Sequence, residues 1–209
     1  MNKHLLHLQN FYDKWKISIN VEKSTAIIFT KKLCLPPPIT MYNKQIPWSQ
    51  EAKYLGIIFD THLTWKQHIT YVRDKFRRIM FKLFPLIGRN SHLSIENKVL
   101  LYTAVMRPIL AYASPVWGYA AKTNINKLDT LQNSLIRMIV KATRYMRNDD
   151  IRKDLKINSF KAYIQNTAIN FFTNLDTINN VNIQNLIPYT PDDNTKKPRR
   201  IILDSYNPP

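Results

Sequence analysis

The sequence predicts an α+β protein in which a short strand-containing segment precedes a longer helical one. Residues 1–62 contain short β-type runs separated by turn residues, so neighbouring strands would pair locally and antiparallel. From residue 63 onward, apolar residues recur at spacings of three and four, the period of a helix that buries one face. We therefore expect units over residues 1–62 and 63–178, followed by a mobile, Pro- and Asn-rich tail over residues 179–209.

A short amphipathic helix should open the first unit, because apolar residues recur there at helical spacing. These residues are Leu5, Leu8, Tyr12 and Trp15. The β-rich run 25–30 predicts a strand, and two short runs around Asn43-Lys44 predict a tight hairpin over residues 39–48. The run 53–59 is the clearest strand in the sequence.

A long helix should open the second unit, because one apolar stripe continues through it. The stripe consists of Trp65, Ile69, Val72, Phe76, Ile79 and Leu83. Most residues off the stripe are basic, with Asp74 the only acid, and Gly88 should end this helical region. The basic residues are Lys66, Arg73, Lys75, Arg77, Arg78 and Lys82.

Further helices follow. Ser94 is a good N-cap for a helix that runs to Arg107, where Pro108 should end or kink it. The apolar periodicity predicts another helix over residues 124–140. Asp149-Asp150 should cap a short helix, and a last helix is expected over residues 159–175.

Composition narrows the classes of function. Lys and Arg number 31 and Asp and Glu 14, so the formal charge of +17 points to a polyanion, either nucleic acid or an anionic membrane surface. The sequence has no apolar run long enough to predict a membrane span. Cys34 is the only cysteine, which fits an intracellular, reducing compartment. Gly56, Gly88 and Gly118 lie far apart, which excludes a glycine-rich phosphate loop.

Five motifs occur in a fixed order along the chain. They are WKISINVEKS (15–24), SQEAKYLGIIFD (49–60), LTWKQHI (63–69), RPILAYASPVWG (107–118) and QNSLIR (132–137). Together they resemble the C-terminal part of the reverse transcriptase of jockey-like non-LTR (LINE-type) retrotransposons. Two positions depart from that pattern, with Ser24 where threonine is usual and Ala113 where glycine is usual.

The resemblance implies a role for each part. Residues 1–62 would be the end of the palm and residues 63–145 the thumb, with further helices following to residue 178. Lys23 would approach the triphosphate of the incoming nucleotide. The turn Tyr54-Leu55-Gly56 would press on the primer 3′ end, with Gly56 allowing close backbone approach. The six basic residues of the long helix would bind phosphates of an RNA–DNA hybrid or another duplex. The family also implies a nuclear location and no membrane partner.

Catalytic carboxylates are the main departure. Reverse transcriptases hold two Mg²⁺ ions with carboxylates that precede the first motif, and only Asp13 lies there in this sequence. Asp149-Asp150 and Asp192-Asp193 do not lie between apolar strands, so neither pair is expected to be catalytic. We expect no catalytic residue and no metal site in this chain. Mg²⁺ and the N-terminal palm and fingers of the polyprotein would belong to the full polymerase.

Simpler interpretations stand beside these. Lys23 could be a solvated lysine in a turn, and the basic residues could be an ordinary solvated helix face. His62 and His68 near Asp60 match no zinc spacing and are explained by a helix start. The chain could be a basic nucleic-acid-binding module without catalysis. It could also be a degenerate remnant whose unpaired strand edges aggregate.

Overall fold

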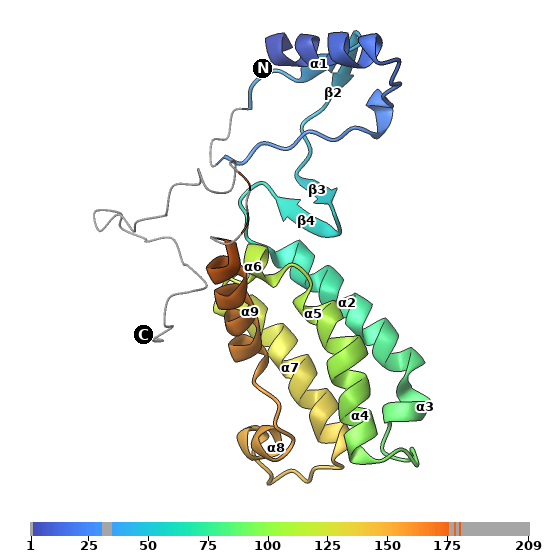
Figure 1. The fold of residues 1–209 in the computed structure, drawn as a ribbon, viewed down its shortest axis with the longest axis vertical. Coiled ribbons are helices and arrows are strands. Elements are labelled where there is room, and N and C mark those ends of the chain that lie inside the picture. The colour runs from blue at the N-terminus through green and yellow to red at the C-terminus, as the bar shows by residue number, and fades with distance from the viewer. Residues whose placement is uncertain (1, 31–34, 176–177, 179, 181–209) are drawn as a thin grey trace, which may run out of the picture. The chain divides into compact units, whose positions relative to one another are not determined.

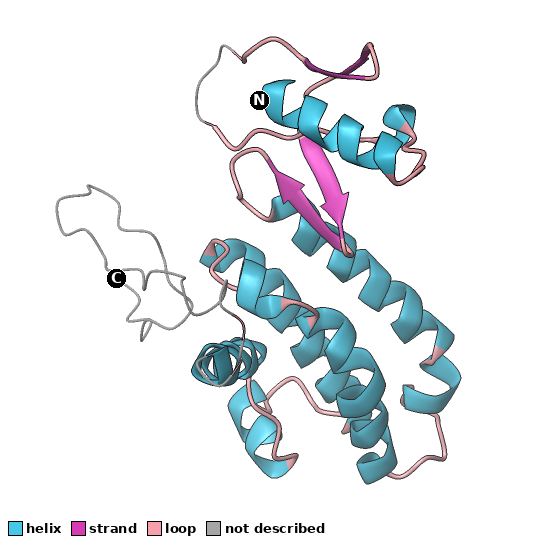
Figure 2. Cartoon of the chain, turned by 45° about the horizontal axis from the view of Figure 1, so that its top comes forward, coloured by secondary structure: helices cyan, strands magenta, loops and turns pink. Residues whose placement is uncertain are grey.

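A computed structural model describes residues 2–30, 35–175, 178 and 180 of the chain. Two compact units divide between His68 and Ile69. The α+β class is confirmed, because helices dominate and the strands form two small antiparallel sheets in the first unit (Figures 1 and 2). Cys34 and the predicted tail beyond residue 180 lie outside the described residues.

The first unit contains two short helices and two hairpins. Its elements are α1 (Asn2–Lys14), η1 (Val21–Lys23), β1 (Ile39–Met41), β2 (Lys44–Ile46), β3 (Glu51–Tyr54) and β4 (Ile57–Asp60). The strand β1 pairs with β2, and β3 pairs with β4. Four residues form a small core, onto which Tyr12 of α1 and Trp48 pack. The core residues are Val21, Ala26, Met41 and Ile46.

Both hairpins turn through two residues with positive φ, as type I′ turns do. Tyr42 and Asn43 have φ of 49° and 57°, so the predicted first hairpin is confirmed with its turn one residue earlier than expected. The second turn is formed by Leu55 and Gly56, with φ of 47° and 83°. The prediction of one strand over residues 53–59 is therefore wrong, because this turn divides the run into β3 and β4.

The predicted strand over residues 25–30 is also wrong. Ala26 forms an isolated parallel bridge with Trp48, and the Ser49 N–H donates to the Ala26 carbonyl at 2.7 Å. Among the described residues, this bridge is the only strand pairing recorded for the run. A β-branched sequence needs a continuous neighbouring strand to form a ladder, and here the neighbouring chain leaves after one residue.

The second unit is helical. Its elements are α2 (Lys66–Lys82, whose first turn lies in the first unit), α3 (Phe84–Ile87), α4 (Ile95–Leu101), the π-helix η2 (Tyr102–Met106), α5 (Arg107–Ala111), α6 (Ser114–Trp117), α7 (Lys122–Ile139), α8 (Asn148–Asp154) and α9 (Phe160–Leu175). In Figure 1 the helix α2, the α4–α5 segment, α7 and α9 run in alternating directions. The largest buried side chains include Phe76, Trp117, Leu128 and Phe160, which fill the centre of this bundle.

The predicted helices are found with small shifts in their ends. The Ser94 hydroxyl accepts the Asn97 N–H at 3.3 Å and caps α4 as expected. Pro108 does not end the helix. The backbone widens into η2, where the Arg107 N–H donates to the Tyr102 carbonyl five residues earlier, and the chain then continues as α5. A π-turn accommodates a residue that cannot donate in the α-helical pattern.

Candidate nucleic-acid interface

The start of α2 is fixed by Asp60 at the end of β4. This buried carboxylate accepts the backbone N–H groups of Thr64 at 2.9 Å and Trp65 at 2.8 Å. It also accepts the His62 N–H and the Thr64 hydroxyl, both at 3.2 Å. A helix begins with N–H groups that have no partner inside the helix, and one carboxylate satisfies several of them here. Asp60 therefore caps the first turn of α2.

The apolar stripe of α2 is confirmed at its first four positions. Trp65, Ile69, Val72 and Phe76 are all buried. Ile79 is half-buried. Burial of this stripe leaves the remaining circumference of the helix to polar side chains, which carry six cations and one carboxylate. The helix therefore has a formal charge of +5 at neutral pH.

The six cations form two rows, because residues three, four or seven positions apart share a helix face. The first row is Lys66, Arg73 and Arg77, and the second row is Lys75, Arg78 and Lys82. Arg73 is half-buried, and its Nε lies 3.2 Å from a carboxylate oxygen of Asp74. The second row is fully exposed, and no ion pair joins it to any residue that the structure describes.

A hollow of 590 Å³ lies along the second row. Its lining combines cations with aromatic rings. The lining residues are Tyr71, Lys75, Arg77, Arg78, Ile79, Phe81 and Lys82. The Phe81 side chain is 82% exposed, so folding buries little of its ring. Cations bind phosphate groups, and exposed rings contact sugars or bases, so this surface has the chemistry of a nucleic-acid interface. We call it the α2 basic face.

The predicted primer-contacting residues form the tip of the second hairpin. Tyr54 and Leu55 are 66% and 70% exposed, and Gly56 completes the turn. Gly56 is required there by its φ of 83°, a conformational reason that differs from the close approach expected from the sequence. The hairpin thus presents two large apolar side chains to solvent.

Lys23 lies at the end of η1 and is exposed. The Asn20 side chain accepts the Lys23 N–H at 3.1 Å, and the Ser24 hydroxyl donates to the Asn20 carbonyl at 3.0 Å. The Asn and Ser of the first motif thus hold the turn that presents this lysine. The position and the turn are compatible with either a ligand contact or a solvated lysine.

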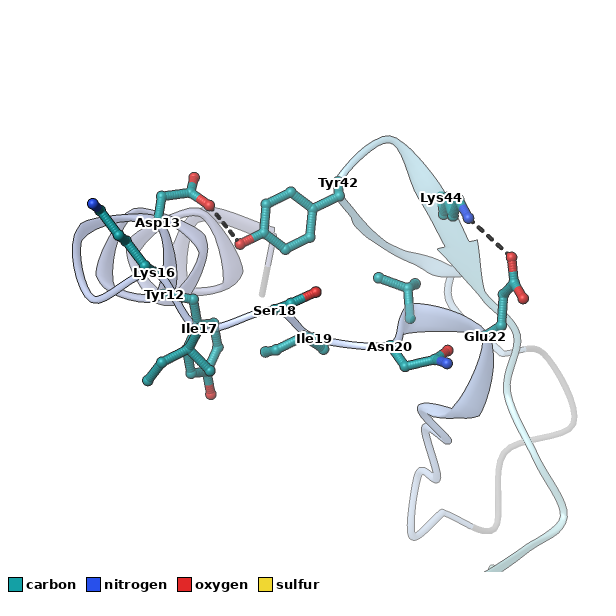
Figure 3. Close-up of a pocket in the computed structure, with 11 residues that line it drawn as sticks. Tyr12, Asp13, Lys16, Ile17, Ser18, Ile19, Asn20, Glu22, Tyr42 and Lys44 are labelled. Carbon is teal, nitrogen blue, oxygen red and sulfur yellow. Dashed lines mark hydrogen bonds and ion pairs between the residues drawn. The ribbon is translucent and has the colours of Figure 1, made fainter.

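A second hollow, of 730 Å³, lies beside this turn between the end of α1 and the first hairpin (Figure 3). The Tyr42 hydroxyl donates to Asp13 at 2.9 Å across one side of it, and Lys44 pairs with Glu22 at 2.9 Å on the other. Lys23 is not among the lining residues, so the structure does not bring this hollow and the predicted triphosphate contact together.

The described residues contain no group of three or more His, Cys, Asp or Glu side chains that could hold a metal ion. Asp149 and Asp150 lie in the first turn of α8, where Asp149 pairs with Arg152. Asp192-Asp193 lie outside the described residues. His68 accepts the Ile58 N–H at 3.3 Å through Nδ1 and so helps to hold the hairpin. No described helix is long and apolar enough to cross a membrane.

Several cations are occupied inside the fold. The buried Lys98 ammonium donates to the carbonyls of Gly88 at 3.1 Å and Ser91 at 3.2 Å. Arg107 lies over the Tyr163 ring at 4.2 Å. The net charge of the sequence therefore counts side chains that serve the fold, whereas the α2 basic face presents cations outward.

Comparison with known proteins finds relatives of this chain among mobile-element polymerases. It is 35% identical to the RNA-directed DNA polymerase from mobile element jockey of Drosophila funebris over 177 residues, or 85% of this chain and 19% of the relative. The chain is homologous to these polymerases. It is also 33% identical to the probable RNA-directed DNA polymerase from transposon X-element of Drosophila melanogaster, over 69% of this chain and 16% of the relative.

A third relative extends the match along the chain. The probable RNA-directed DNA polymerase from transposon BS of Drosophila melanogaster is 27% identical over 193 residues, or 91% of this chain and 21% of the relative. The chain thus spans about a fifth of the length of these relatives. No family model and no solved structure matches it. The resemblance drawn from five motifs is confirmed as homology to jockey-like polymerases.

Sequence reasoning missed the aromatic part of the α2 basic face. Tyr71 precedes Lys75 by four residues, and Arg78 and Lys82 continue the same row at spacings of three and four. The spacing in the sequence already divides the six cations into two rows, and this division is the signal that identifies the face with Tyr71. Asp60 was also missed as a cap, because a capping carboxylate cannot be distinguished from other acids until the helix start is known.

Proposed function

We propose that this chain is the thumb and the adjoining end of the palm of a jockey-like RNA-directed DNA polymerase, and that it holds the template–primer duplex. In this proposal the α2 basic face lies along an RNA–DNA hybrid and binds its phosphates without reading the base sequence. The Tyr54-Leu55-Gly56 turn contacts the primer end, and Lys23 contacts the nucleotide triphosphate. The site of action would be the nucleus, where a mobile element meets its target DNA.

The α2 basic face carries this proposal. Three exposed cations in one row, with no partner ion among the residues described, cost free energy through mutual repulsion unless an anion covers them. The exposed Phe81 beside them adds an apolar contact that a simple solvated face would not need. Homology to polymerases that copy RNA into DNA makes a nucleic-acid duplex the matching polyanion.

Nucleotide addition needs more than the described residues provide. Two Mg²⁺ ions would activate the primer hydroxyl and stabilise the leaving group, and the carboxylates that hold them would come from the palm of the same polymerase. We therefore expect residues 1–209 alone to bind template–primer and not to extend it. Extension that begins when the palm and fingers are supplied in trans would support the polymerase proposal over a binding module without catalysis.

Replacement of one row tests the duplex contact. The triple variant Lys75→Gln/Arg78→Gln/Lys82→Gln should bind a fluorescent RNA–DNA hybrid on the order of 100-fold more weakly at about 0.15 M salt, if each side chain neutralises one phosphate. The loss should be equal for hybrids of unrelated sequence, since phosphates carry no sequence information.

The matched control changes the same amount of charge on other helices of the same unit. It is Lys122→Gln/Lys127→Gln/Lys161→Gln, on α7 and α9. This control should bind the hybrid within a few-fold of the wild-type chain. Equal losses in the two triple variants would show that net charge, and not the α2 basic face, determines binding, and would contradict the proposal.

A further inference from the structure

A second basic and aromatic surface lies outside α2, in residues 141–147 between α7 and α8. The Arg137 side chain of α7 donates hydrogen bonds to this loop and to the start of α8. Its Nη1 donates to the Met146 carbonyl at 2.7 Å and the Asn148 side-chain oxygen at 3.1 Å, and its Nη2 donates to the Thr143 carbonyl at 2.5 Å. Ala142 is buried at the loop's start. One guanidinium thus ties two points of the loop and the first residue of α8 to α7, so the loop presents its outer side chains in a fixed arrangement.

Tyr145 lies at the tip of this loop and is 93% exposed, the most exposed of the large apolar and aromatic residues that the structure describes. Its ring buries almost no surface, so it contributes little to the hydrophobic stabilisation of the fold. Exposure of this ring to water therefore does not stabilise the folded chain. Its chemistry is that of a stacking platform for a planar ligand.

The side chains around the ring are cations. Lys141, Arg144 and Arg147 are exposed, and none forms an ion pair with a described residue. Two carboxylates follow them in α8: Asp149 is paired with Arg152, and Asp150 is exposed. Three cations and a ring thus lie within the seven residues of the loop, which contains no acid.

Unpaired nucleotides fit this surface better than a duplex does. In a duplex the base faces are already stacked, so a protein ring gains contact only with a base that is free to leave its neighbours. A single strand offers base faces and phosphates in alternation, which matches a ring flanked by Arg144 and Arg147. An anionic membrane would satisfy the cations, but Tyr145 and Met146 alone offer too little apolar surface for stable insertion.

We propose that loop 141–147 binds single-stranded nucleic acid, with one unpaired base stacked on Tyr145 and the adjacent phosphates bound by Arg144 and Arg147. The inference rests on the proposed function, because a template strand beyond the duplex supplies the unpaired nucleotides. In Figures 1 and 2 the loop follows the end of α7, at the end of the helical unit toward which α2 runs.

The test compares a fluorescent oligo(dT) single strand with a blunt RNA–DNA hybrid, using the whole chain. Tyr145→Ala should weaken single-strand binding about 5- to 150-fold and leave hybrid binding within about twofold. Tyr145→Phe should bind the single strand like the wild-type chain, since the ring remains. Arg144→Gln/Arg147→Gln should weaken single-strand binding and reduce the slope of log K against log salt by about 1.4, at about 0.7 for each of two phosphates.

Three results would overturn the assignment. One is unchanged single-strand affinity in Tyr145→Ala, and another is an equal loss on single strand and hybrid. The third is a Tyr145→Ala chain that no longer binds phosphatidylserine vesicles but keeps the single-strand affinity of the wild-type chain. That result would make the loop a membrane contact. Failure of the proposed function looks different, because it would appear as an unchanged hybrid affinity in the α2 triple variant, whatever Tyr145 does.

Discussion

His68 joins the first turn of α2 to the second hairpin through its ring. It is 1% exposed, and its Nδ1 accepts the Ile58 N–H, which joins the first turn of α2 to the hairpin. Only a neutral imidazole can accept this hydrogen bond, and burial lowers the pKa of His68 to about 4. Asp60 acts on the same junction from β4 through its bonds to Thr64 and Trp65. The start of α2 is thus held by two buried polar side chains, Asp60 and His68.

The lowered pKa of His68 predicts a pH-dependent stability. Above about pH 6.5, His68 is neutral in both the folded and unfolded chains, so its titration does not change the free energy of unfolding. As the pH falls from about 6.5 to about 4, only the unfolded chain takes up the proton, so the free energy of unfolding should fall by up to about 3 kcal/mol. Below about pH 4 this group causes no further loss.

Urea titrations of the wild-type chain and His68→Asn from pH 7 to pH 4 check this prediction. Asparagine retains an acceptor for the Ile58 N–H and does not titrate in this range. The difference in unfolding free energy between the two chains should shrink as the pH falls. A difference that stays constant across this range would contradict the buried neutral state of His68.

At the scale of elements, the helices were predictable and the strands were only partly so. The helical period extends over many residues in α2 and α7, so several buried positions agree on the same answer. The hairpins depend on two-residue turns, and Leu55-Gly56 lacks the Asn or Asp that usually marks such a turn. The run 25–30 has strand-like residues but lacks a strand beside it, and only tertiary structure reveals that.

A substitution at Leu55 should have opposite effects on the stability of the chain and on its binding to a template–primer. A leucine with φ of 47° is strained, whereas asparagine accepts this conformation more readily. Leu55→Asn should therefore raise the free energy of unfolding by about 0.5–1 kcal/mol. If the exposed leucine contacts the primer end, the same variant should bind a recessed template–primer more weakly than the wild-type chain.

Urea titration and binding to a recessed template–primer measure the two effects together. Gly56→Ala is the matched control, because its φ of 83° makes any side chain unfavourable and should lower the free energy of unfolding by about 1 kcal/mol. A Leu55→Asn chain that is more stable and binds the template–primer unchanged would remove the hairpin tip from the proposed primer contact.

At the scale of the whole molecule, the net charge indicates the class of ligand, a polyanion, but not the surface that binds it. The formal charge of +17 indicated a polyanion, yet Lys98, Arg107 and Arg137 are engaged within the fold. The six predicted cations of α2 divide into two rows, and the whole second row, with Arg77 of the first, lines a hollow beside the exposed Phe81 ring. Sequence can count charges and place them on a helix, but burial and partners decide which of them face a ligand.

The salt dependence of hybrid binding tests the central claim most directly. If six α2 cations reach phosphates, the logarithm of the association constant of residues 1–209 for an RNA–DNA hybrid should fall against the logarithm of salt concentration with a slope of about −5. The Lys75→Gln/Arg78→Gln/Lys82→Gln variant should reduce the slope's magnitude by about 3, to about −2 to −3. The same slope in this variant and in the wild-type chain would contradict duplex binding by the α2 basic face.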